Sequence, residues 1–346
     1  MREPGLNLRP FVSVIMPCRN EEKHIGRCLD SILANDYPKE CIEILVIDGQ
    51  STDRTREIVE RHASRSGHIR LIDNRAIVQT YATNFGLKAA KGEYIIRMDA
   101  HAEYPSDYIR TCVDWLEREQ VDVVGGVCET KPGGTSTVAR AISMVLSSPF
   151  GVGNSYFRTG ITGPRLVDTV PFGCYRREIF DRVGLFDERL DRTDDLEFNL
   201  RVRKNGGRLL LVPAISSIYY ARPTLWSLAK QNFGNGFWIM YSLKFVRLPF
   251  SGRHLVPMLF VLSLLSGVVL SAFTPLLLVL SLLVLVAHAA ANFIFSFSLS
   301  ARQGLQYFPL VFLTFFVLHI SYGIGSLAGA LKLLLPVRSK GESIGR

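Results

Sequence analysis

Three long apolar stretches in the last third of this 346-residue chain restrict its fold more than any other feature. They run over 255–273, 276–295 and 308–335, and only Arg302 and Lys332 are charged between His254 and Leu335. An apolar segment of about 20 residues can cross a hydrocarbon core about 30 Å thick as a helix. Because none of the three shows a polar face, the pattern predicts a membrane domain over 254–335 with about three apolar spans.

The charge of the chain is unevenly distributed. Up to Thr224 there are 31 Lys+Arg against 30 Asp+Glu, whereas from Leu225 onward there are 9 Lys+Arg against the single acid Glu342. The basic excess therefore lies beside the apolar stretches, and no motif that reads RNA or DNA is present. This distribution indicates attraction to anionic membrane lipids or a positive-inside topology, and it argues against a nucleic-acid partner.

Basic residues flank the apolar stretches at both ends. Lys244, Arg247 and Arg253 precede the first stretch and predict that this end faces the cytoplasm. Three crossings would then leave the basic tail over 336–346 outside, against the same tendency. Either one stretch is re-entrant or the tail departs from the rule.

The segment 225–253 mixes aromatic residues with lysines, which suits an amphipathic helix lying in the membrane interface. An ordinary amphipathic core helix is the alternative. Ahead of it, 1–224 has no apolar run of a cleaved signal peptide, and the six cysteines include no C-x-x-C pair, so we expect a reduced, cytosolic domain. The predicted domains are 1–224, 225–253, 254–335 and a tail over 336–346.

Short apolar or β-branched runs alternate with helical patterns through the first hundred residues. Strands are expected at 11–16, 42–47, 69–72 and 94–96, with helices at about 25–33, 53–65 and 79–91. This alternation predicts an α/β fold with a mostly parallel, doubly wound sheet. Further elements are expected at 107–118, 121–127, 178–183 and 194–204, whereas 130–170 has weak periodicity and reads either as a loop over a ligand or as uninformative.

The strand at 94–96 runs into Asp99-Ala100-His101. In open α/β sheets, ligands collect beyond the carboxyl ends of the strands. An acid and an imidazole at such an end suit a cation that holds a phosphate-bearing substrate. A surface turn is the alternative that these residues alone leave open.

Five such motifs follow one another along the chain. They are Pro17-Cys18-Arg19-Asn20-Glu21, Asp48-Gly49-Gln50-Ser51-Thr52-Asp53, Ala82-Thr83-Asn84-Phe85-Gly86, Asp99-Ala100-His101 and Thr193-Asp194-Asp195. Together they resemble the motifs of the family 2 glycosyltransferases, over residues 11–245. The resemblance implies a nucleotide-sugar-binding domain of the GT-A type. The stretch 97–105, with the terminal apolar segments, looks most like the succinoglycan-type exopolysaccharide glucosyltransferases.

The resemblance implies a donor-nucleotide site at the ends of the first strands. Asp48 is expected to face the base or ribose, and Pro17, Arg19 and Glu21 to line the same pocket. Gly49 stands where the family often has a second Asp. Asn84 and Gly86 are expected to pack beneath the site as structural support.

By the same resemblance, Asp99 and His101 occupy an Asp-x-Asp position that binds a divalent cation, Mn²⁺ or Mg²⁺, together with the donor diphosphate. Histidine in the last place departs from the commonest pattern. Imidazole suits Mn²⁺ better than Mg²⁺, which prefers oxygen ligands. We therefore expect Mn²⁺ to be at least as effective as Mg²⁺.

Asp195 resembles the catalytic base of the family, and Asp194 is expected beside it near the acceptor or diphosphate. A sugar hydroxyl is a weak nucleophile until its proton is accepted, and a positioned carboxylate contributes about 10²–10⁴-fold. One base without a nucleophilic carboxylate implies inversion at the sugar C1. Acids that favour a helix N-terminus are the alternative reading of Asp194 and Asp195.

Gln231 lies where membrane synthases carry a Gln-x-x-Arg-Trp motif, but no Arg-Trp pair follows it. Gln231 is therefore expected near the acceptor or diphosphate, and a processive synthase is disfavoured. The resemblance implies a multi-pass protein of the bacterial inner membrane with a cytoplasmic catalytic domain. It would move a sugar, glucose by resemblance, from a UDP-sugar to a polyprenyl-diphosphate-linked saccharide. The alternatives are transfer to polyprenyl phosphate, a processive synthase, and a non-catalytic membrane scaffold.

Overall fold

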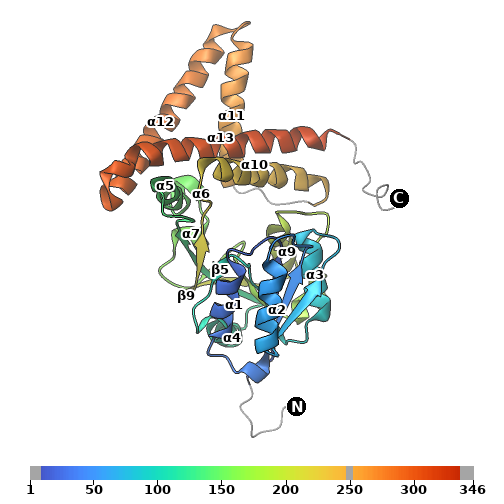
Figure 1. Ribbon diagram of the computed structural model, residues 1–346. Helices are drawn as coiled ribbons and strands as arrows, with labels where there is room; N and C mark the ends of the chain where they lie inside the picture. Colours follow the sequence, from blue (N-terminus) through green and yellow to red (C-terminus); the bar gives the residue numbers. More distant parts are fainter. Residues whose placement is uncertain (1–8, 247–251, 336–346) are drawn as a thin grey trace. The chain divides into compact units, whose positions relative to one another are not determined.

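The computed structural model describes residues 9–246 and 252–335, which form two compact units, Met1–Arg222 and Pro223–Arg346 (Figure 1). The domain boundaries predicted at 224/225, 253/254 and 335/336 stay a prediction. The tail over 336–346 and the segment 247–251 lie outside the described residues.

The first unit is built on one sheet. Its strands are β1 Val12–Cys18, β2 Ile42–Asp48, β3 Ile69–Asp73, β4 Tyr94–Arg97, β5 Ala102–Glu103, β6 Val123–Lys131, β7 Arg165–Leu166, β8 Cys174–Arg176 and β9 Leu209–Tyr220. The order across the sheet is β3-β2-β1-β4-β8-β6-β9-β5, with β7 paired to β9. The strands β3, β2, β1 and β4 are parallel, so their carboxyl ends meet at one edge.

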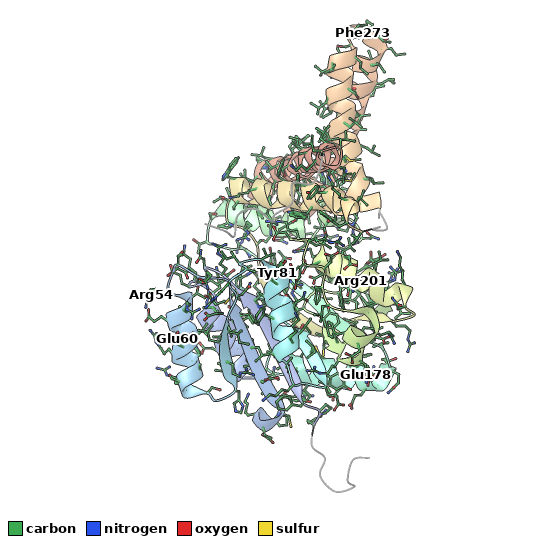
Figure 2. The ribbon with its side chains drawn as sticks, turned by 90° about the vertical axis from the view of Figure 1, so that its right-hand side faces the viewer. Arg54, Glu60, Tyr81, Glu178, Arg201 and Phe273 are labelled. Carbon is green, nitrogen blue, oxygen red and sulfur yellow. The ribbon has the colours of Figure 1, made fainter. Side chains whose placement is uncertain are left out.

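Helices cover both faces of this sheet (Figure 1). They are α1 Ile25–Leu33, η1 Lys39–Cys41, α2 Thr55–Arg65, α3 Gln79–Ala89, α4 Tyr108–Glu119, α5 Thr137–Leu146, α6 Pro149–Val152, α7 Tyr156–Thr159, α8 Glu178–Val183 and α9 Asp194–Lys204. Successive side chains of a strand point to opposite faces. Val14 and Met16 of β1 therefore pack in a cluster with α1, α2 and α4, whereas Ile15 packs with α3, α8 and α9. Figure 2 shows Glu60 of α2 and Glu178 of α8 on opposite sides of the unit.

The predicted α/β fold is confirmed, and short antiparallel ladders complete it as a mixed sheet. β8 lies antiparallel between β4 and β6, and β5 and β7 pair antiparallel with β9. The long strand β9 was not predicted, because Pro213 interrupts its apolar run. The pairing of β6 with β9 shifts register between Gly126 and Val127, opposite this interruption. The stretch 130–170 contains the helices α5, α6 and α7 and the short strand β7, with irregular segments between them.

The second unit is helical. Its elements are α10 Leu225–Tyr241, η2 Ser242–Lys244, α11 Gly252–Leu270, α12 Pro275–Gln303, η3 Leu305–Tyr307 and α13 Phe308–Leu333. Within the described residues, three helices are long and apolar enough to cross a membrane: α11, α12, and α13 with η3. Helix α12 extends beyond the predicted stretch to Gln303, and Ser296 and Ser300 in this extension are fully buried. Asn292 Nδ2 donates to the Phe312 carbonyl oxygen at 3.0 Å, and Ser296 Oγ donates to Asn292 Oδ1 at 2.8 Å.

The contact between α3 and the sheet gives a first testable prediction. A Cβ at Gly86 would lie 2.5 Å from Ile15 Cγ2 and 2.9 Å from Ile47 Cδ1. Alanine normally stabilises a helix relative to glycine, but here overpacking should cost about 1–3 kcal/mol, so we expect Gly86→Ala to lower the Tm of the purified protein. The matched control is Gly67→Ala, where a Cβ has no neighbour within 4 Å. Equal Tm values for both variants would contradict the close packing.

Candidate active site

The polar residues that follow β1 and β2 are joined to each other. The Asn20 amide donates to Ser51 Oγ at 2.9 Å, and the Thr52 amide donates to Asn20 Oδ1 at 2.9 Å. The Glu21 amide donates to Thr55 Oγ1 at 2.7 Å. These bonds fix the two loops against each other at the carboxyl edge of the parallel strands. Asn20 sits at φ 55°, a left-handed conformation that asparagine tolerates.

Asp48 ends β2 and is fully buried. Its carboxylate accepts the Ser51 amide at 3.1 Å and Arg56 Nη1 at 3.0 Å, and the same Arg56 nitrogen contacts Asp73 Oδ1 at 2.5 Å. Asp48 thus organises the loop between β2 and α2. Its predicted contact with a nucleotide stays a prediction.

The other predicted donor-site residues lie around the end of β1. Pro17 pairs in register with Ile47 and is half-buried, and Arg19 is exposed. A Cβ at Gly49 would lie 3.5 Å from Arg19 Cβ, so the second loop adjoins Arg19 directly. Glu21 is turned toward the next strand end, where its Oε1 lies 3.2 Å from His101 Nδ1.

Asp99 follows β4 and is held through its backbone. Its amide donates to the hydroxyl oxygen of buried Tyr104 at 2.9 Å, and its carbonyl oxygen accepts the Ala102 amide at 3.3 Å. Among residues 9–246 and 252–335, no hydrogen bond described for Asp99 uses its half-buried carboxylate. The strand end therefore presents a carboxylate free to accept a ligand.

His101 lies between Glu21 and the ring of Tyr219, whose centroid is 6.0 Å away. Burial opposes a charge on His101, but the hydrogen bond with Glu21 and the Asp99 carboxylate outweigh it and raise the pKa of His101. With Nδ1 on Glu21, Nε2 is the ring nitrogen that could serve as a ligand.

The donor atoms suit a cation that is shared with substrate. Asp99 and His101 supply one carboxylate and one imidazole, and the described residues contain no group of three His, Cys, Asp or Glu that could hold a metal ion alone. Mg²⁺ in phosphate-transfer sites commonly takes one or two carboxylates and completes its shell with water and substrate phosphates. Asp99 and His101 offer donor types that such a cation could use, and a substrate diphosphate could supply further ligands.

Arg97, the last residue of β4, joins this strand to the start of α9. Its buried Nη1 donates to Asp194 Oδ2 at 3.1 Å and also to Asp195 Oδ1. Asp194 is buried, whereas the Asp195 side chain keeps 40% of its surface exposed. Arg97 thus holds Asp195 at the end of β4, and Asp99 follows Arg97 two residues later in the chain. The sequence signal for this role was a charged residue at the end of a fully buried strand, which needs a partner.

Three carboxylates and one guanidinium share this part of the unit. Desolvation by the surrounding protein raises the pKa of Asp195 to about 7, with Asp194 and Asp99 adding to the shift and Arg97 opposing it. A carboxylate with a pKa near neutral can accept a proton in a reaction at pH 7.

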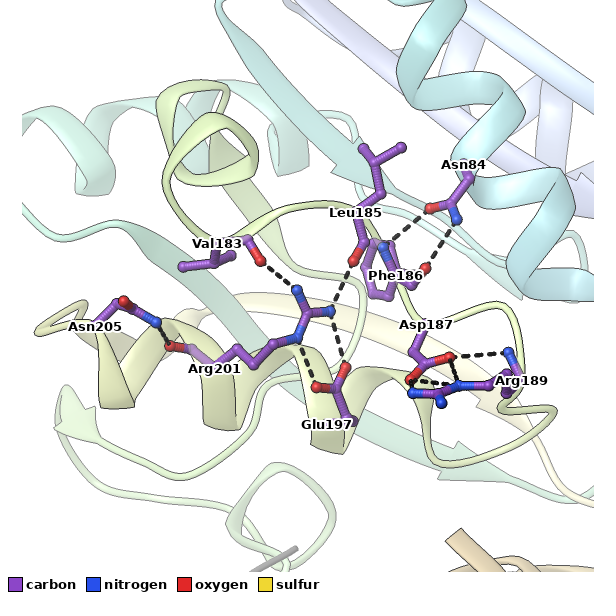
Figure 3. Close-up of polar contacts among 9 residues, drawn as sticks. All are labelled: Asn84, Val183, Leu185, Phe186, Asp187, Arg189, Glu197, Arg201 and Asn205. Atoms are coloured by element: carbon purple, nitrogen blue, oxygen red, sulfur yellow. Dashed lines mark hydrogen bonds and ion pairs between the residues drawn. The ribbon is translucent and has the colours of Figure 1, made fainter. Parts of the chain in front are cut away.

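A second network of hydrogen bonds holds α9 against the loop that precedes it (Figure 3). Arg201 donates from Nε to Glu197 Oε1 at 2.6 Å and from Nη2 to the Leu185 carbonyl oxygen at 2.7 Å. Asn84 of α3 donates to the Phe186 carbonyl oxygen at 2.9 Å and accepts the Phe186 amide at 3.0 Å. Helices α3 and α9 are thereby tied to one loop, which fits the supporting role expected of Asn84. Gln231 belongs to α10 in the second unit, and its role stays a prediction.

The arrangement has counterparts among known proteins. The family model described as glycosyl transferase family 2 matches residues 13–184. A dolichyl N-acetyl-α-D-glucosaminyl phosphate 3-β-D-2,3-diacetamido-2,3-dideoxy-β-D-glucuronosyltransferase of Methanococcus voltae is 33% identical over 236 residues, which is 65% of this chain and 72% of the relative. The succinoglycan biosynthesis protein ExoA of Rhizobium meliloti is 32% identical over 225 residues, which is 64% of this chain and 67% of the relative.

Solved structures show the same fold. A mannosyltransferase of Pyrobaculum calidifontis, in complex with GDP-Man and Mn²⁺, has a TM-score of 0.58 and 21% identity over 93% of this chain and 88% of that one. The fold is therefore of the GT-A type. At the level of sequence, the chain belongs to glycosyl transferase family 2.

The contact of Arg97 with Asp195 gives a second prediction. Arg97→Lys keeps the charge but shortens the side chain and moves the donor nitrogen away from the position of Nη1, which contacts both acids. We therefore expect kcat to fall by about 10–100-fold while the donor KM changes little. The control is Arg189→Lys, which alters an exposed pair with Asp187. Steady-state sugar-transfer kinetics measure both. An unchanged kcat in Arg97→Lys would show that Arg97 does not position Asp195.

Proposed function

We propose that this glycosyltransferase transfers glucose from UDP-glucose to a polyprenyl-diphosphate-linked saccharide, with inversion at C1, at the cytoplasmic face of a bacterial inner membrane. The observation that carries the reaction is the buried Arg97, which holds Asp194 and Asp195 while Asp99 follows on the same chain. Acid groups for the acceptor and for the donor diphosphate are thereby kept close to one another.

In this mechanism Asp195 accepts the proton of the acceptor hydroxyl as that oxygen attacks the sugar C1. The new C1–O bond forms on the face opposite the bond to the nucleoside diphosphate, which breaks and releases the diphosphate. Asp99 and His101 would hold the divalent cation. When bound, that cation neutralises charge on the leaving diphosphate. Asp194 stays paired with Arg97, and a single displacement with one base inverts C1.

The acceptor is proposed from the relatives and from the second unit. The name of the Methanococcus voltae relative describes transfer to a dolichyl-linked sugar phosphate, and ExoA is named for succinoglycan biosynthesis. Helices long and apolar enough to cross a membrane suit an enzyme whose acceptor is anchored in lipid. Gly234 and Asn235 stand where a processive synthase would have Arg and Trp after Gln231. Retention of Asp195 argues against a silent scaffold.

The direct test is an assay of the full-length protein in lipid nanodiscs. UDP-glucose, UDP-galactose and UDP-N-acetylglucosamine are offered with either a polyprenyl-diphosphate-linked saccharide or bare polyprenyl phosphate, and the lipid products are identified by mass spectrometry. We expect glucose to be added to the lipid-linked saccharide. Transfer to bare phosphate alone would establish the alternative acceptor, and stepwise polymer would establish a processive synthase.

Substitution of the base gives a third prediction. Asp195→Asn keeps the shape of the side chain but cannot accept a proton, so we expect kcat to fall by about 10²–10⁴-fold. The matched control is Asp191→Asn, an exposed acid four residues earlier, which should retain activity. Circular dichroism checks that both variants fold. Full transfer by Asp195→Asn would remove this residue from the mechanism.

The ligand set gives a fourth prediction. We expect chelation to abolish transfer and Mn²⁺ to restore it at least as well as Mg²⁺, because one proposed ligand is an imidazole nitrogen. His101→Asp replaces that nitrogen with oxygen and should shift the preference toward Mg²⁺. Direct titration of Mn²⁺ followed by electron paramagnetic resonance separates metal binding from turnover. An identical Mn²⁺ to Mg²⁺ activity ratio in the wild type and His101→Asp would exclude His101 as a ligand.

A further inference from the structure

Helices α10 and α13 of the second unit pack with their backbones in contact. A Cβ at Gly325 would lie 2.1 Å from the Phe233 carbonyl oxygen, and one at Gly329 would lie 2.2 Å from that of Phe237. A step of four residues along α10 thus matches a step of four along α13, so the two helices run in the same direction. Lys244, just after α10, donates to the Leu335 carbonyl oxygen just after α13. The second half of α13 therefore lies beside α10 along its length.

Helix α10 is unsuited to crossing a membrane. Its 17 residues reach about 25 Å and include Lys230, Asn232 and Asn235. The first end of α10 is joined to the catalytic unit by the chain. Between its other end and the apolar part of α11 lie Lys244, Arg247 and Arg253. Both ends of α10 therefore belong on the side of the catalytic unit, and so does the end of α13 that it accompanies.

Helices α11 and α12 form a hairpin. Ser281 Oγ of α12 donates to the Ser263 carbonyl oxygen of α11 at 2.7 Å, and Phe273 lies at the far tip with 84% of its surface exposed (Figure 2). The basic residues before α11 place the open end of the hairpin on the side of the catalytic unit.

The first half and the middle of α13 contact this hairpin at its open end. His254 Nδ1 lies 3.0 Å from the Tyr322 hydroxyl oxygen, a Cβ at Gly323 would lie 2.3 Å from the Pro257 carbonyl oxygen, and Asn292 bonds to Phe312 at 3.0 Å. Figure 1 shows α13 running across that end, away from the tip. A third span alongside the hairpin would instead follow it toward Phe273. Accordingly, 44% of the apolar part of α13 is buried in protein, whereas the corresponding share is 17% for α11 and 11% for α12.

The charges favour the same arrangement. With two crossings, all 9 Lys+Arg from Leu225 onward lie on the side of the catalytic unit, and the connection 271–274 at the tip carries no charge. A spanning α13 would place Lys332, Arg338, Lys340 and Arg346 on the opposite side. The two-crossing arrangement satisfies the positive-inside tendency at every basic residue.

We infer that only α11 and α12 cross the membrane, and that α10 and α13 lie together along its surface on the side of the catalytic unit, with anionic lipid as their partner. Trp226 and Phe233 of α10 and Leu331 of α13 are exposed apolar residues, and Lys230 and Lys332 lie on the same two helices. Apolar side chains that enter the interface beside lysines are typical of helices bound to anionic membrane surfaces. This assignment concerns the membrane surface and does not depend on the proposed sugar or acceptor.

Thiol labelling in the full-length protein tests the crossings. Phe273→Cys and Ser339→Cys are each expressed in bacteria whose outer membrane is permeabilised, and a membrane-impermeant maleimide is added before or after lysis. All six native cysteines are buried, so the parent protein is the background control. We expect Phe273→Cys to label before lysis and Ser339→Cys only after it. Labelling of Ser339→Cys before lysis would show that α13 spans, and protection of Phe273→Cys would show that the hairpin does not cross.

Spin labels along α13 test its position in the bilayer. Leu313, Ile320 and Leu331 are exposed, and labels there in the full-length protein are read by power saturation in vesicles of phosphatidylcholine with phosphatidylglycerol. We expect all three labels at a similar, shallow depth, and a label at Leu262 of α11 near the bilayer centre. Because 18 residues of helix span about 27 Å, a spanning α13 would give depths that pass through the centre, which would overturn the inference.

Discussion

The pairing of Arg97 with Asp194 and Asp195 is the interaction on which the catalytic unit depends. A guanidinium at the end of a fully buried strand is tolerated only with an anionic partner, and removing one member of such a set leaves an uncompensated charge. The partners lie 97 and 98 residues further along the chain. The pairing therefore joins the central sheet to α9, and it determines where Asp195, the proposed base, lies relative to the strand end that carries Asp99.

The surrounding structure maintains this geometry in layers. Tyr104 fastens the backbone of Asp99 and leaves its carboxylate available. Glu21 fixes the ring of His101 from the end of another strand. Arg201 and Asn84 tie α9 and α3 to the loop between α8 and α9, so the helix that carries Asp194 and Asp195 is held from both ends. Backbone rigidity is thus combined with side chains free for a ligand, which is what a transfer site requires.

Elements formed by residues close together in the sequence could be predicted, whereas contacts between residues distant in the sequence could not. Asp48 and Asp99 lie at the ends of strands that are continuous apolar runs in the sequence. The motifs at these strand ends are short enough to recognise. Strand β9 was missed because Pro213 divides its sequence into two short runs. The register of its pairing with β6 shifts at the same place, next to Gly126. Arg97 received no role because its partners are distant in sequence, and the pairing of Glu21 with His101 joins residues 80 apart. The predicted roles of Pro17, Arg19, Asp48 and Gln231 stay predictions, because contacts to a donor or acceptor define them.

The pH dependence of kcat tests the central claim, that Asp195 is a base whose pKa is raised by desolvation and by the neighbouring carboxylates. In the proposed mechanism the carboxylate form is the active one, and the pKa of Asp195, about 7, lies above that of an ordinary aspartate. Activity should therefore be fully present above pH 7 and fall about tenfold for each unit below it, with this acid limb absent from the residual activity of Asp195→Asn. A kcat that stays constant from pH 8 down to pH 5, or an acid limb that survives in Asp195→Asn, would contradict the account.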